Sequence, residues 1–381
     1  MTSFEFATAN RIIFGAGKLS GLGDQLKGSV KRLLLVRGRS SDAIPRVREI
    51  LSAQGILFNE FEVHGEPTVA MVREGVTFAE GCDAVIGLGG GSVMDAGKAI
   101  AALATNQQDV MDYLEVVGKG QSLTEKPLMY VAIPTTAGTG AEVTRNAVLD
   151  VPEHGVKVSL RSPMMLPSLA IVDPELTYSL PPEITAASGL DALTQLIEPF
   201  VSAKANPMTD AICREGMAYA AKSLQRAYHS GADKEAREGM ALASLFGGLA
   251  LANAALGAVH GFAGPLGGML HAPHGAICAK LLPLVMEANI KTMQSENHAG
   301  LARYEEVARI VTGNQTATVD DGVKWVSDLV SEFKIPSLSS HGMTETHIPE
   351  AVQKTLNASS YKGNPLPLNE QILSEILTKA L

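Results

Sequence analysis

Short apolar runs alternate with amphipathic stretches over roughly the first half of the chain. The runs have the composition of buried strands and the stretches have helical spacing. The runs are residues 31–36, 56–63, 83–88, 128–133 and 169–173, and the stretches are 42–54, 69–80 and the segment from Val93. Strands and helices that alternate at intervals of roughly thirty residues are typical of a doubly wound parallel sheet. Such a sheet binds ligands at the carboxyl ends of its strands, where loops lead into helices.

The second half of the chain has a different pattern. After Pro181 and Pro182, long segments rich in alanine and leucine have helical spacing, and no strands alternate with them. These segments are residues 185–203, 209–228, 234–254 and 304–311. We therefore expect an α/β domain over residues 1–178 and an all-helical domain over residues 179–381, which suits a chain of 381 residues.

The composition excludes several classes of protein. Hydrophobic residues make up 46% of the chain and charged residues 19%, which excludes a disordered chain. The 31 Lys and Arg against 40 Asp and Glu give a net charge of −9, so we expect no nucleic-acid partner. Cys82, Cys213 and Cys278 lie far apart. We therefore expect neither a disulfide framework nor a thiolate zinc cluster, and a reducing, cytoplasmic location.

One long uncharged segment, residues 241–279, raises the question of a membrane span. Small residues fill its middle, and Asn253, His260 and His271 interrupt its apolar character. A helix buried in a large helical core is the better interpretation, and we expect no membrane partner. The N-terminal sequence carries charges where a signal peptide needs an apolar core, so we do not expect secretion.

The first segment that carries chemistry is a glycine loop, Gly89-Gly90-Gly91, directly after a predicted strand. Glycines let the backbone approach an anion closely, and the N–H groups of the following helix point at it. Ser92 is suited to be the N-cap of that helix, with Asp95 as its capping-box partner. The alternative is a tight turn that binds nothing, and the loop is not the G-x-G-x-x-G dinucleotide fingerprint.

A second polar loop, residues 134–144, follows the next predicted strand. Thr135, Thr136 and Thr139 lie beside two glycines and form a cradle suited to phosphate, ribose and amide groups. A solvated loop is the alternative. Two such loops on neighbouring strands of one sheet favour a nucleotide site.

The motifs GGGSVMDAGK, IPTTAGTGAEVT, LAIVDPELT, GLDAL, HGFAGPLGG, PHG and KGNP follow one another in this chain. In this order they resemble iron-containing (group III) alcohol dehydrogenases over nearly the whole length. The resemblance implies a Rossmann-like N-terminal domain, a helical C-terminal domain and an active site in the cleft between them. It also implies NAD(P)-dependent hydride transfer to or from a small aldehyde, ketone or alcohol, and a homodimer.

The resemblance assigns roles to the two loops and to one lysine. Gly90, Gly91 and Ser92 would hold the pyrophosphate with Asp95 beside it, and the loop threonines would flank the adenosine and nicotinamide portions. Lys157 would lie near the nicotinamide ribose. The alternative for Lys157 is a surface lysine that serves solubility only.

The choice of cofactor should depend on the end of the second predicted strand. Many NAD-using relatives carry Asp there, where its carboxylate binds the ribose 2′-hydroxyl and repels a 2′-phosphate. Here Arg37 and Gly38 are followed by Arg39, Ser40 and Ser41, which could receive a phosphate. We therefore favour NADP(H) over NAD(H). The alternative is that both arginines point into solvent.

The family binds one divalent metal, iron or zinc, through one Asp and three His. Asp191, His260 and His274 match three of these ligands, but Gln195 stands where the remaining His is expected. Gln195 lies four residues after Asp191 on one helix face and offers a carbonyl oxygen, a harder ligand than imidazole. Gly264 occupies the position of a family histidine that has a proton-relay role.

Three interpretations of this atypical site stay open. In one, Asp191, Gln195, His260 and His274 bind a metal weakly, and the metal polarises a substrate oxygen. In another, His271 restores a nitrogen ligand or the proton relay. In the last, the metal is lost and His260, His271 and His274 orient and protonate the substrate directly.

Three other functions are consistent with this fold. A maleylacetate reductase-like enzyme would reduce a conjugated bond of an acidic substrate without metal. Lyases such as dehydroquinate synthase share the architecture, but the threonine-rich loop argues against them. A nucleotide binder with a degenerate metal site would bind NADPH without turnover.

Overall fold

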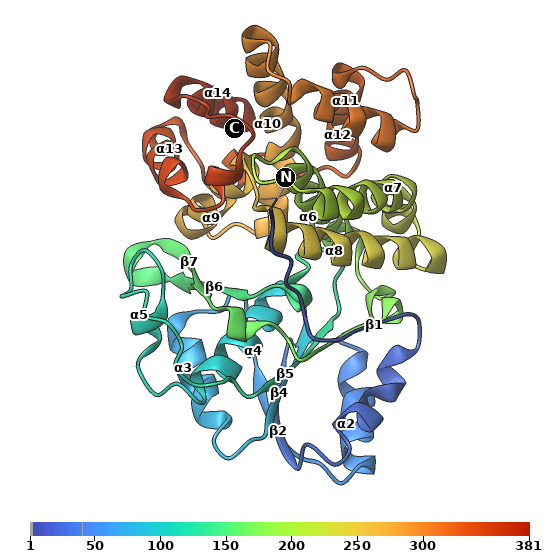
Figure 1. Ribbon diagram of the computed structural model, residues 1–381, viewed down its shortest axis with the longest axis vertical. Coiled ribbons are helices and arrows are strands. Elements are labelled where there is room, and N and C mark those ends of the chain that lie inside the picture. Colours follow the sequence, from blue (N-terminus) through green and yellow to red (C-terminus); the bar gives the residue numbers. More distant parts are fainter. Residues whose placement is uncertain (1–2, 40) are drawn as a thin grey trace. The chain divides into compact units, whose positions relative to one another are not determined.

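The protein is described here by a computed structural model, which covers residues 3–39 and 41–381. The chain divides into two units, Ala7–Leu180 and Pro181–Leu381, and the described residues before Ala7 belong to the second (Figure 1). The division follows Leu180, two residues beyond the boundary predicted at residue 178. The active-site cleft expected between the units stays a prediction.

The unit Ala7–Leu180 is built on a parallel sheet, as the sequence predicts. In the described residues six strands pair in the order β1-β8-β5-β4-β2-β3, and every pair is parallel. The strands are β1 (Ile12–Phe14), β2 (Arg32–Arg37), β3 (Leu57–Glu62), β4 (Ala84–Gly89), β5 (Met129–Pro134) and β8 (Leu169–Val172).

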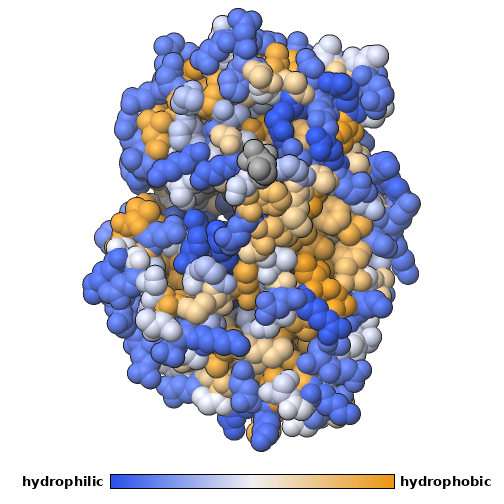
Figure 2. All heavy atoms as spheres, in the orientation of Figure 1, coloured by the Kyte–Doolittle hydropathy of each residue, from blue (hydrophilic) through white to orange (hydrophobic). Residues whose placement is uncertain are grey.

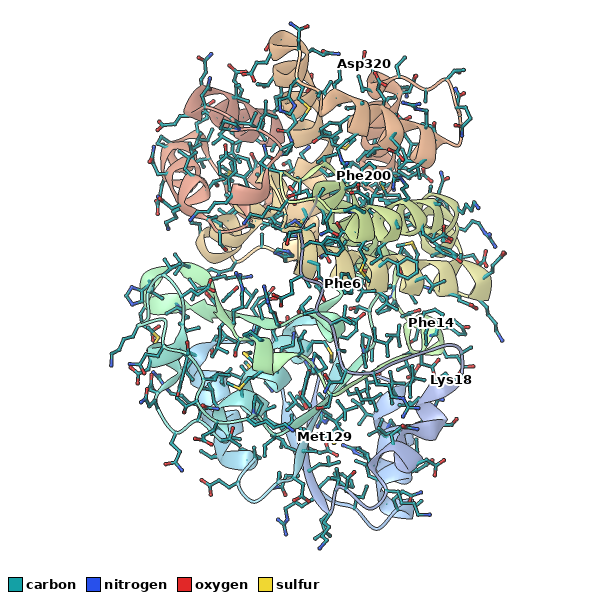
Figure 3. The ribbon with its side chains drawn as sticks, viewed as in Figure 1. Phe6, Phe14, Lys18, Met129, Phe200 and Asp320 are labelled. Atoms are coloured by element: carbon teal, nitrogen blue, oxygen red, sulfur yellow. The ribbon has the colours of Figure 1, made fainter. Side chains whose placement is uncertain are left out.

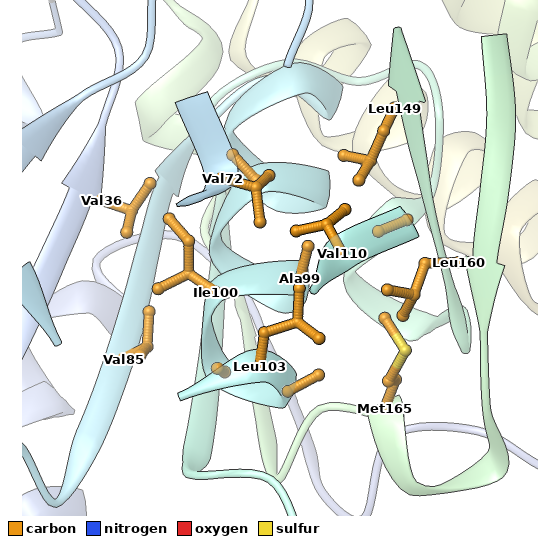
Figure 4. Packing of buried hydrophobic residues seen from close by; sticks show 14 of the residues in the cluster. Val36, Val72, Val85, Ala99, Ile100, Leu103, Val110, Leu149, Leu160 and Met165 are labelled. Carbon is orange, nitrogen blue, oxygen red and sulfur yellow. The ribbon is translucent and has the colours of Figure 1, made fainter. Parts of the chain in front are cut away.

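Helices cover both faces of this sheet, because alternate residues of each central strand point to opposite sides. On β2, Leu34 and Val36 belong to the core under α3 (Val69–Phe78) and α4 (Gly91–Leu103). Leu33 and Leu35 belong to the core under α1 (Leu22–Leu26) and α2 (Ala43–Ala53). Figure 4 shows the first of these cores, which also takes side chains from α5 (Val110–Tyr113). Both faces are therefore buried, and the strand sequences are nearly continuous apolar runs.

The sequence analysis missed a β-hairpin. Strands β6 (Asn146–Val151) and β7 (Val156–Arg161) pair antiparallel outside the main sheet. The connection contains Gly155 in the left-handed conformation, at φ 57°. Ala147, Leu149 and Val151 are buried at every second position, as expected for a hairpin with one face on the core.

In the described part of the unit that begins at Pro181, helices are the only regular secondary structure, as predicted. Its first two helices begin with proline at the first helical position, where the missing N–H costs no hydrogen bond. The helices are α6 (Pro182–Val201), α7 (Pro207–His229), α8 (Lys234–Ala254), α9 (Ala258–Leu270), α10 (His274–Glu296), α11 (Leu301–Thr312), α12 (Val319–Glu332), α13 (Ile348–Asn357) and α14 (Glu370–Ala380).

Helix α6 is fixed to its neighbours near its carboxyl end. Phe200, labelled in Figure 3, is fully buried. The guanidinium groups of Arg303 and Arg214 lie 4.4 and 5.2 Å from the centre of its ring. Arg303 also donates to the backbone oxygen of Phe200. These contacts with α7 and α11 hold the helix that carries Asp191 and Gln195.

Within the described residues, no single helix is both long enough and apolar enough to cross a membrane. Helices α8 and α9 meet the length and composition test only as a pair, and the chain bends by 99° between them.

Hydrophilic side chains cover much of the face shown in Figure 2, with hydrophobic patches between them. The large apolar side chains that are exposed come from separate segments of both units: Phe4, Leu57, Phe78, Val116, Met164, Ile184 and Met208. Single exposures of this kind are normal in folded proteins, and none of these positions is a predicted site residue.

Candidate nucleotide loops and metal centre

The first glycine loop leads directly from β4 into α4. Gly90 is the N-cap in an extended conformation, and no described side chain caps the helix. The prediction that Ser92 is the N-cap is wrong, because the N-cap is Gly90 and the helix begins at Gly91, two residues earlier than predicted. Asp95 is not a capping partner either, since its carboxylate accepts a hydrogen bond from the backbone N–H of Val148 at 3.1 Å. The uncapped first turn leaves backbone N–H groups for an anion.

The two predicted loops lie side by side. The backbone N–H of Thr135 donates to the carbonyl of Gly89 at 2.9 Å. A Cβ atom on Gly91 would lie 2.7 Å from Cγ2 of Thr139, and one on Gly90 would lie 3.3 Å from Cγ2 of Thr136. A side chain at Gly91 would therefore displace Thr139 or the start of α4, and one at Gly90 would make a tight contact with Thr136.

A buried lysine fastens these loops together, a role that the sequence motif does not reveal. Nζ of Lys98 donates to the carbonyls of Ala141 and Asn146, both at 2.8 Å, and to the hydroxyl of Thr144 at 2.9 Å. Burial lowers the pKa of Lys98 to about 8, although the charges of Asp95 and Glu142 oppose this shift. The threonine loop and β6 are thereby tied to α4.

Lys157 lies inside the unit and is not a surface lysine. Its side chain is 5% exposed, and Nζ lies 3.2 Å from Oε1 of Glu66. The other oxygen of Glu66 lies 3.4 Å from the hydroxyl of Ser92. Nζ makes no hydrogen bond with good geometry to any described residue. The side chain is thus linked through Glu66 to the first glycine loop, and its role toward a cofactor stays a prediction.

Arg37 is held by two carboxylates. Strands β2 and β3 place Arg37 opposite Glu62, and its guanidinium donates to Glu62 at 2.6 Å and to Glu60 at 2.8 Å. The alternative that Arg37 points into solvent is wrong, because its side chain is 16% exposed. A cofactor phosphate would have to compete with both carboxylates for this guanidinium. Arg39 is exposed, and Ser40 lies outside the described residues.

A cavity lies near these residues. It measures about 260 Å³, and its lining includes Ser41, Arg46 and Glu175. The guanidinium of Arg46 lies 3.7 Å from Glu175, a looser pairing than that of Arg37. Gly38 has room for a side chain, since a Cβ there would meet Val93 at 3.7 Å and no other described atom within 4 Å.

The carboxylate of Glu60 predicts a pH dependence of stability. Hydrogen bonds from Arg48 and Arg37 lower the pKa of Glu60 from 4.5 to about 2, against the opposing effect of burial. A lowered carboxyl pKa stabilises the fold above pH 4.5, and this contribution is lost as the pH falls toward about 2. The urea concentration at the midpoint of unfolding should therefore fall as the pH is lowered between these values. We expect this fall to be smaller in Glu60→Gln than in the wild type. The exposed Glu80→Gln serves as control, and equal slopes for wild type and Glu60→Gln would refute the argument.

The second unit brings four potential metal ligands together. Asp191 lies on α6, His260 on α9, and His274 and Cys278 lie one turn apart on α10. One ligand atom from each lies within 4.8 Å of all the others. Oδ1 of Asp191 is 3.5 Å from Nε2 of His260 and 3.8 Å from Nε2 of His274. Sγ of Cys278 is 3.6 Å from Nε2 of His274 and 3.9 Å from Nε2 of His260.

The electrostatics of this cluster favour a bound cation. Burial alone would lower the pKa of His274, but the charge and hydrogen bond of Cys278, together with Asp191, raise it to about 9. Against the same burial, Cys278, Asp191 and Glu198 raise the pKa of His260. These negative groups therefore favour positive charge at the two imidazole rings, and a metal ion would supply that charge in place of protons. Carboxylate oxygen, imidazole nitrogen and thiolate sulfur are all ligands of divalent zinc, so the residues fit a metal ion.

An unpaired carboxylate oxygen points to the same conclusion. Oδ1 of Asp191 is buried and finds no hydrogen-bond partner in the part of the chain that the structure describes. A buried polar atom without a partner is costly unless a ligand or ion satisfies it.

Glu198 orients His260, and the sequence analysis did not identify it. Oε2 of Glu198 lies 2.7 Å from Nδ1 of His260, and Oε1 accepts the backbone N–H of Val259 at 2.7 Å. With Nδ1 donating to the carboxylate, Nε2 presents its lone pair to the cluster. An acid in the apolar end of α6, seven residues after Asp191, is a signal that sequence reading could have used.

Two other positions that the sequence analysis considered for this site, His271 and Gly264, do not contribute to the ligand group found among the described residues. His271 is exposed and ends α9 in the left-handed conformation. Its catalytic role stays a prediction. At Gly264 a Cβ would meet no described atom within 4 Å, so no neighbouring side chain fills the position of the family's relay histidine. Cys278 was not predicted as a ligand.

Family models match both units. The description "Iron-containing alcohol dehydrogenase" matches residues 9–174, and "Fe-containing alcohol dehydrogenase family, C-terminal" matches residues 185–381.

Individual relatives match over nearly their full length. The chain is 35% identical to 1,3-propanediol dehydrogenase of Klebsiella pneumoniae over 99% of this chain and 98% of that protein. It is 34% identical to choline dehydrogenase of Bacillus subtilis over 97% and 92%. Among solved structures, a 1,3-propanediol oxidoreductase superposes with a TM-score of 0.92 at 34% identity, covering both chains completely. A sulfoacetaldehyde reductase from Bifidobacterium kashiwanohense in complex with NAD+ superposes at 0.86 and 28% identity, over 100% and 99% of the chains.

Proposed function

Because the chain belongs to the iron-containing alcohol dehydrogenase family, it is an oxidoreductase, and we propose that it transfers hydride between NAD(P)(H) and a small aldehyde, ketone or alcohol. The observation that carries this proposal is the convergence of Asp191, His260, His274 and Cys278 in a buried cluster of ligand atoms. In this proposal the domain of residues 1–178 binds the dinucleotide and the domain of residues 179–381 binds metal and substrate.

The glycine and threonine loops supply the proposed cofactor site. The uncapped start of α4 at Gly90, Gly91 and Ser92 would bind the pyrophosphate through backbone N–H groups. Thr135, Thr136 and Thr139 offer hydroxyls from the adjoining loop, and Lys98 keeps that loop in place. Lys157 offers a buried ammonium group linked through Glu66 to Ser92.

The metal cluster supplies the proposed reaction site. A divalent metal held by the cluster would act as a Lewis acid that polarises the substrate oxygen. Glu198 fixes the ring of His260, and the burial of Asp191 and His260 limits the access of water to these two ligands. The chain therefore binds and orients, while the nicotinamide carries the hydride.

A carbonyl panel tests this function. We expect metal-loaded protein to oxidise NADPH or NADH with small aldehydes, and stripped protein to lose that activity and regain it on reloading. Equal turnover of stripped protein, best on acidic conjugated substrates, would favour the maleylacetate reductase-like alternative. Cofactor binding without turnover on any carbonyl would favour the degenerate nucleotide binder.

The preference for NADP(H) over NAD(H) is a separate part of the proposal. It is supported by Gly38 where NAD-using relatives carry Asp, by the exposed Arg39, and by Ser41 and Arg46 in the neighbouring cavity. Arg37 contributes less than its position suggests, because Glu60 and Glu62 already neutralise it.

We expect Gly38→Asp to shift the preference toward NADH. The new carboxylate has space beside Val93, and it would repel a 2′-phosphate while accepting hydrogen bonds from a 2′-hydroxyl. The ratio of kcat/KM for NADPH to that for NADH measures the shift, with Gly38→Ala as the control for added bulk. An unchanged ratio in Gly38→Asp would show that the end of β2 does not contact the 2′-substituent of the cofactor ribose.

We also propose a cytoplasmic homodimer without nucleic-acid or membrane partners. The homodimer is inferred from the family resemblance. The cytoplasmic location and the lack of nucleic-acid and membrane partners are inferred from the composition and from the spacing of the cysteines.

A further inference from the structure

We propose that Cys278 has taken the ligand position that Gln195 leaves, and that this thiolate makes the centre a zinc site. The proposal rests on the proposed function only in that it requires a metal centre in this unit. It names the ligands Asp191, His260, His274 and Cys278, and it gives Gln195 a positioning role.

The placement of Cys278 on α10 carries the proposal. Residues four apart on a helix share a face, so Cys278 lies beside His274 and directs Sγ toward both imidazoles. The ligand count of four is therefore kept although Gln195 replaces an imidazole. The family arrangement takes two ligands from α6 and one from α10, whereas this chain offers one from α6 and two from α10.

The other cysteines show that this placement is not a general property of buried thiols. Cys82 and Cys213 are buried as well, and burial raises the pKa of each thiol above its ordinary value. Neither belongs to the group of potential ligands found among the described residues. Only Cys278 combines burial with two imidazoles and a carboxylate around its sulfur.

Gln195 is better placed to hold Asp191 than to bind metal. It lies four residues after Asp191 on the same face of α6, and it is 2% exposed. An amide nitrogen at this position can donate to the carboxylate of Asp191 and orient it. Its carbonyl oxygen, which no described donor satisfies, is a weak ligand compared with a thiolate.

The donor set decides between zinc and ferrous iron. Zinc binds a given site more tightly than ferrous iron does, and a soft thiolate suits it well. Asp191 and the Cys278 thiolate also balance the charge of a divalent ion, whereas one carboxylate with three imidazoles leaves a net positive charge. The swap thus favours a neutral zinc centre.

Cobalt substitution tests the ligand directly. Protein stripped of metal and reloaded with Co²⁺ should show a near-ultraviolet thiolate-to-cobalt charge-transfer band together with visible d–d bands. Cys278→Ser should lose the charge-transfer band. Cys213→Ser, a buried cysteine of the same unit, should keep it. A wild-type spectrum without this band, or a band that survives in Cys278→Ser, would overturn the proposal.

Metal competition tests the selectivity. Dialysed against equal Zn²⁺ and Fe²⁺ without oxygen, wild-type protein should retain mainly zinc by elemental mass spectrometry. Cys278→Ser should lose zinc affinity by roughly 10- to 100-fold. Adding Gln195→His to Cys278→Ser should restore affinity, and this rescue would also show that the Cys278→Ser substitution is compatible with a folded metal site. Retention of mainly iron by the wild type, or no rescue by Gln195→His, would contradict the exchange of ligands.

These readouts separate the proposal from the proposed function. If carbonyl reduction proceeds in protein that binds no metal, the zinc proposal fails while the oxidoreductase survives. If Cys278 binds zinc but no carbonyl is reduced, the zinc proposal stands and the proposed function fails.

Discussion

Replacing His274 by alanine is expected to abolish both metal binding and turnover, while the affinity for NADPH stays nearly unchanged. The substitution removes one of the ligands whose donor atoms lie within 4.8 Å of one another. It also removes one of the two imidazoles that lie close to both Asp191 and Cys278. The predicted cofactor loops all lie in the other unit of the chain.

Metal content by elemental mass spectrometry, steady-state turnover, and NADPH affinity by calorimetry measure the three quantities. His298→Ala is the matched control, because it removes an exposed imidazole from the same unit. Turnover by His274→Ala equal to that of wild type would end the metal-assisted interpretation.

Replacing Gly91 by valine is expected to have the opposite pattern, with cofactor binding lost and metal content unchanged. A Cβ at residue 91 would lie 2.7 Å from Cγ2 and 3.0 Å from Oγ1 of Thr139. Accommodating it must displace either the threonine loop or the first turn of α4, and both belong to the proposed phosphate cradle. Turnover should therefore fall to background although the metal centre is intact.

Gly21→Val is the control for this substitution, since a Cβ at Gly21 would meet no described atom within 4 Å. Calorimetric titration with NADPH reports the loss of binding, and the far-ultraviolet circular dichroism spectrum reports the fold. Wild-type affinity in a folded Gly91→Val protein would show that this loop does not hold the cofactor.

The main sheet could be predicted from the sequence because its central strands are buried on both faces. All six residues of β4 are buried, so its sequence is apolar throughout and stands out from its surroundings. The hairpin β6–β7 was missed because only one of its faces lies on the core. Its buried Ala147 and Leu149 are separated by Val148, which is apolar but only partly buried, so this short segment shows no clear alternation of apolar and polar residues.

Local rules failed where tertiary pairing decides the outcome. Ser92 has the right residue type for an N-cap, but the N-cap is Gly90, whose extended backbone lies two residues earlier. Arg37 looked free for a phosphate because its partners, Glu60 and Glu62, lie on the neighbouring strand. The register that pairs β2 with β3 is not visible in either strand alone.

The metal centre could be predicted only in part, because some of its residues are brought together by tertiary packing. Asp191, His260 and His274 could be proposed from the order of motifs, since each lies in a segment that resembles the family. Cys278 and Glu198 reach the site only through the packing of α6, α9 and α10. The four-residue spacing of His274 and Cys278 is a local signal, but alone it does not distinguish a ligand from a core residue.

The metal content of the purified protein, measured by elemental mass spectrometry alongside activity of stripped and reloaded samples, is the most direct measurement. We expect near-stoichiometric metal, zinc in preference to iron, with NAD(P)H-dependent carbonyl reduction that rises and falls with it. Full activity in protein that contains no metal and does not respond to its addition would contradict the metal-assisted mechanism.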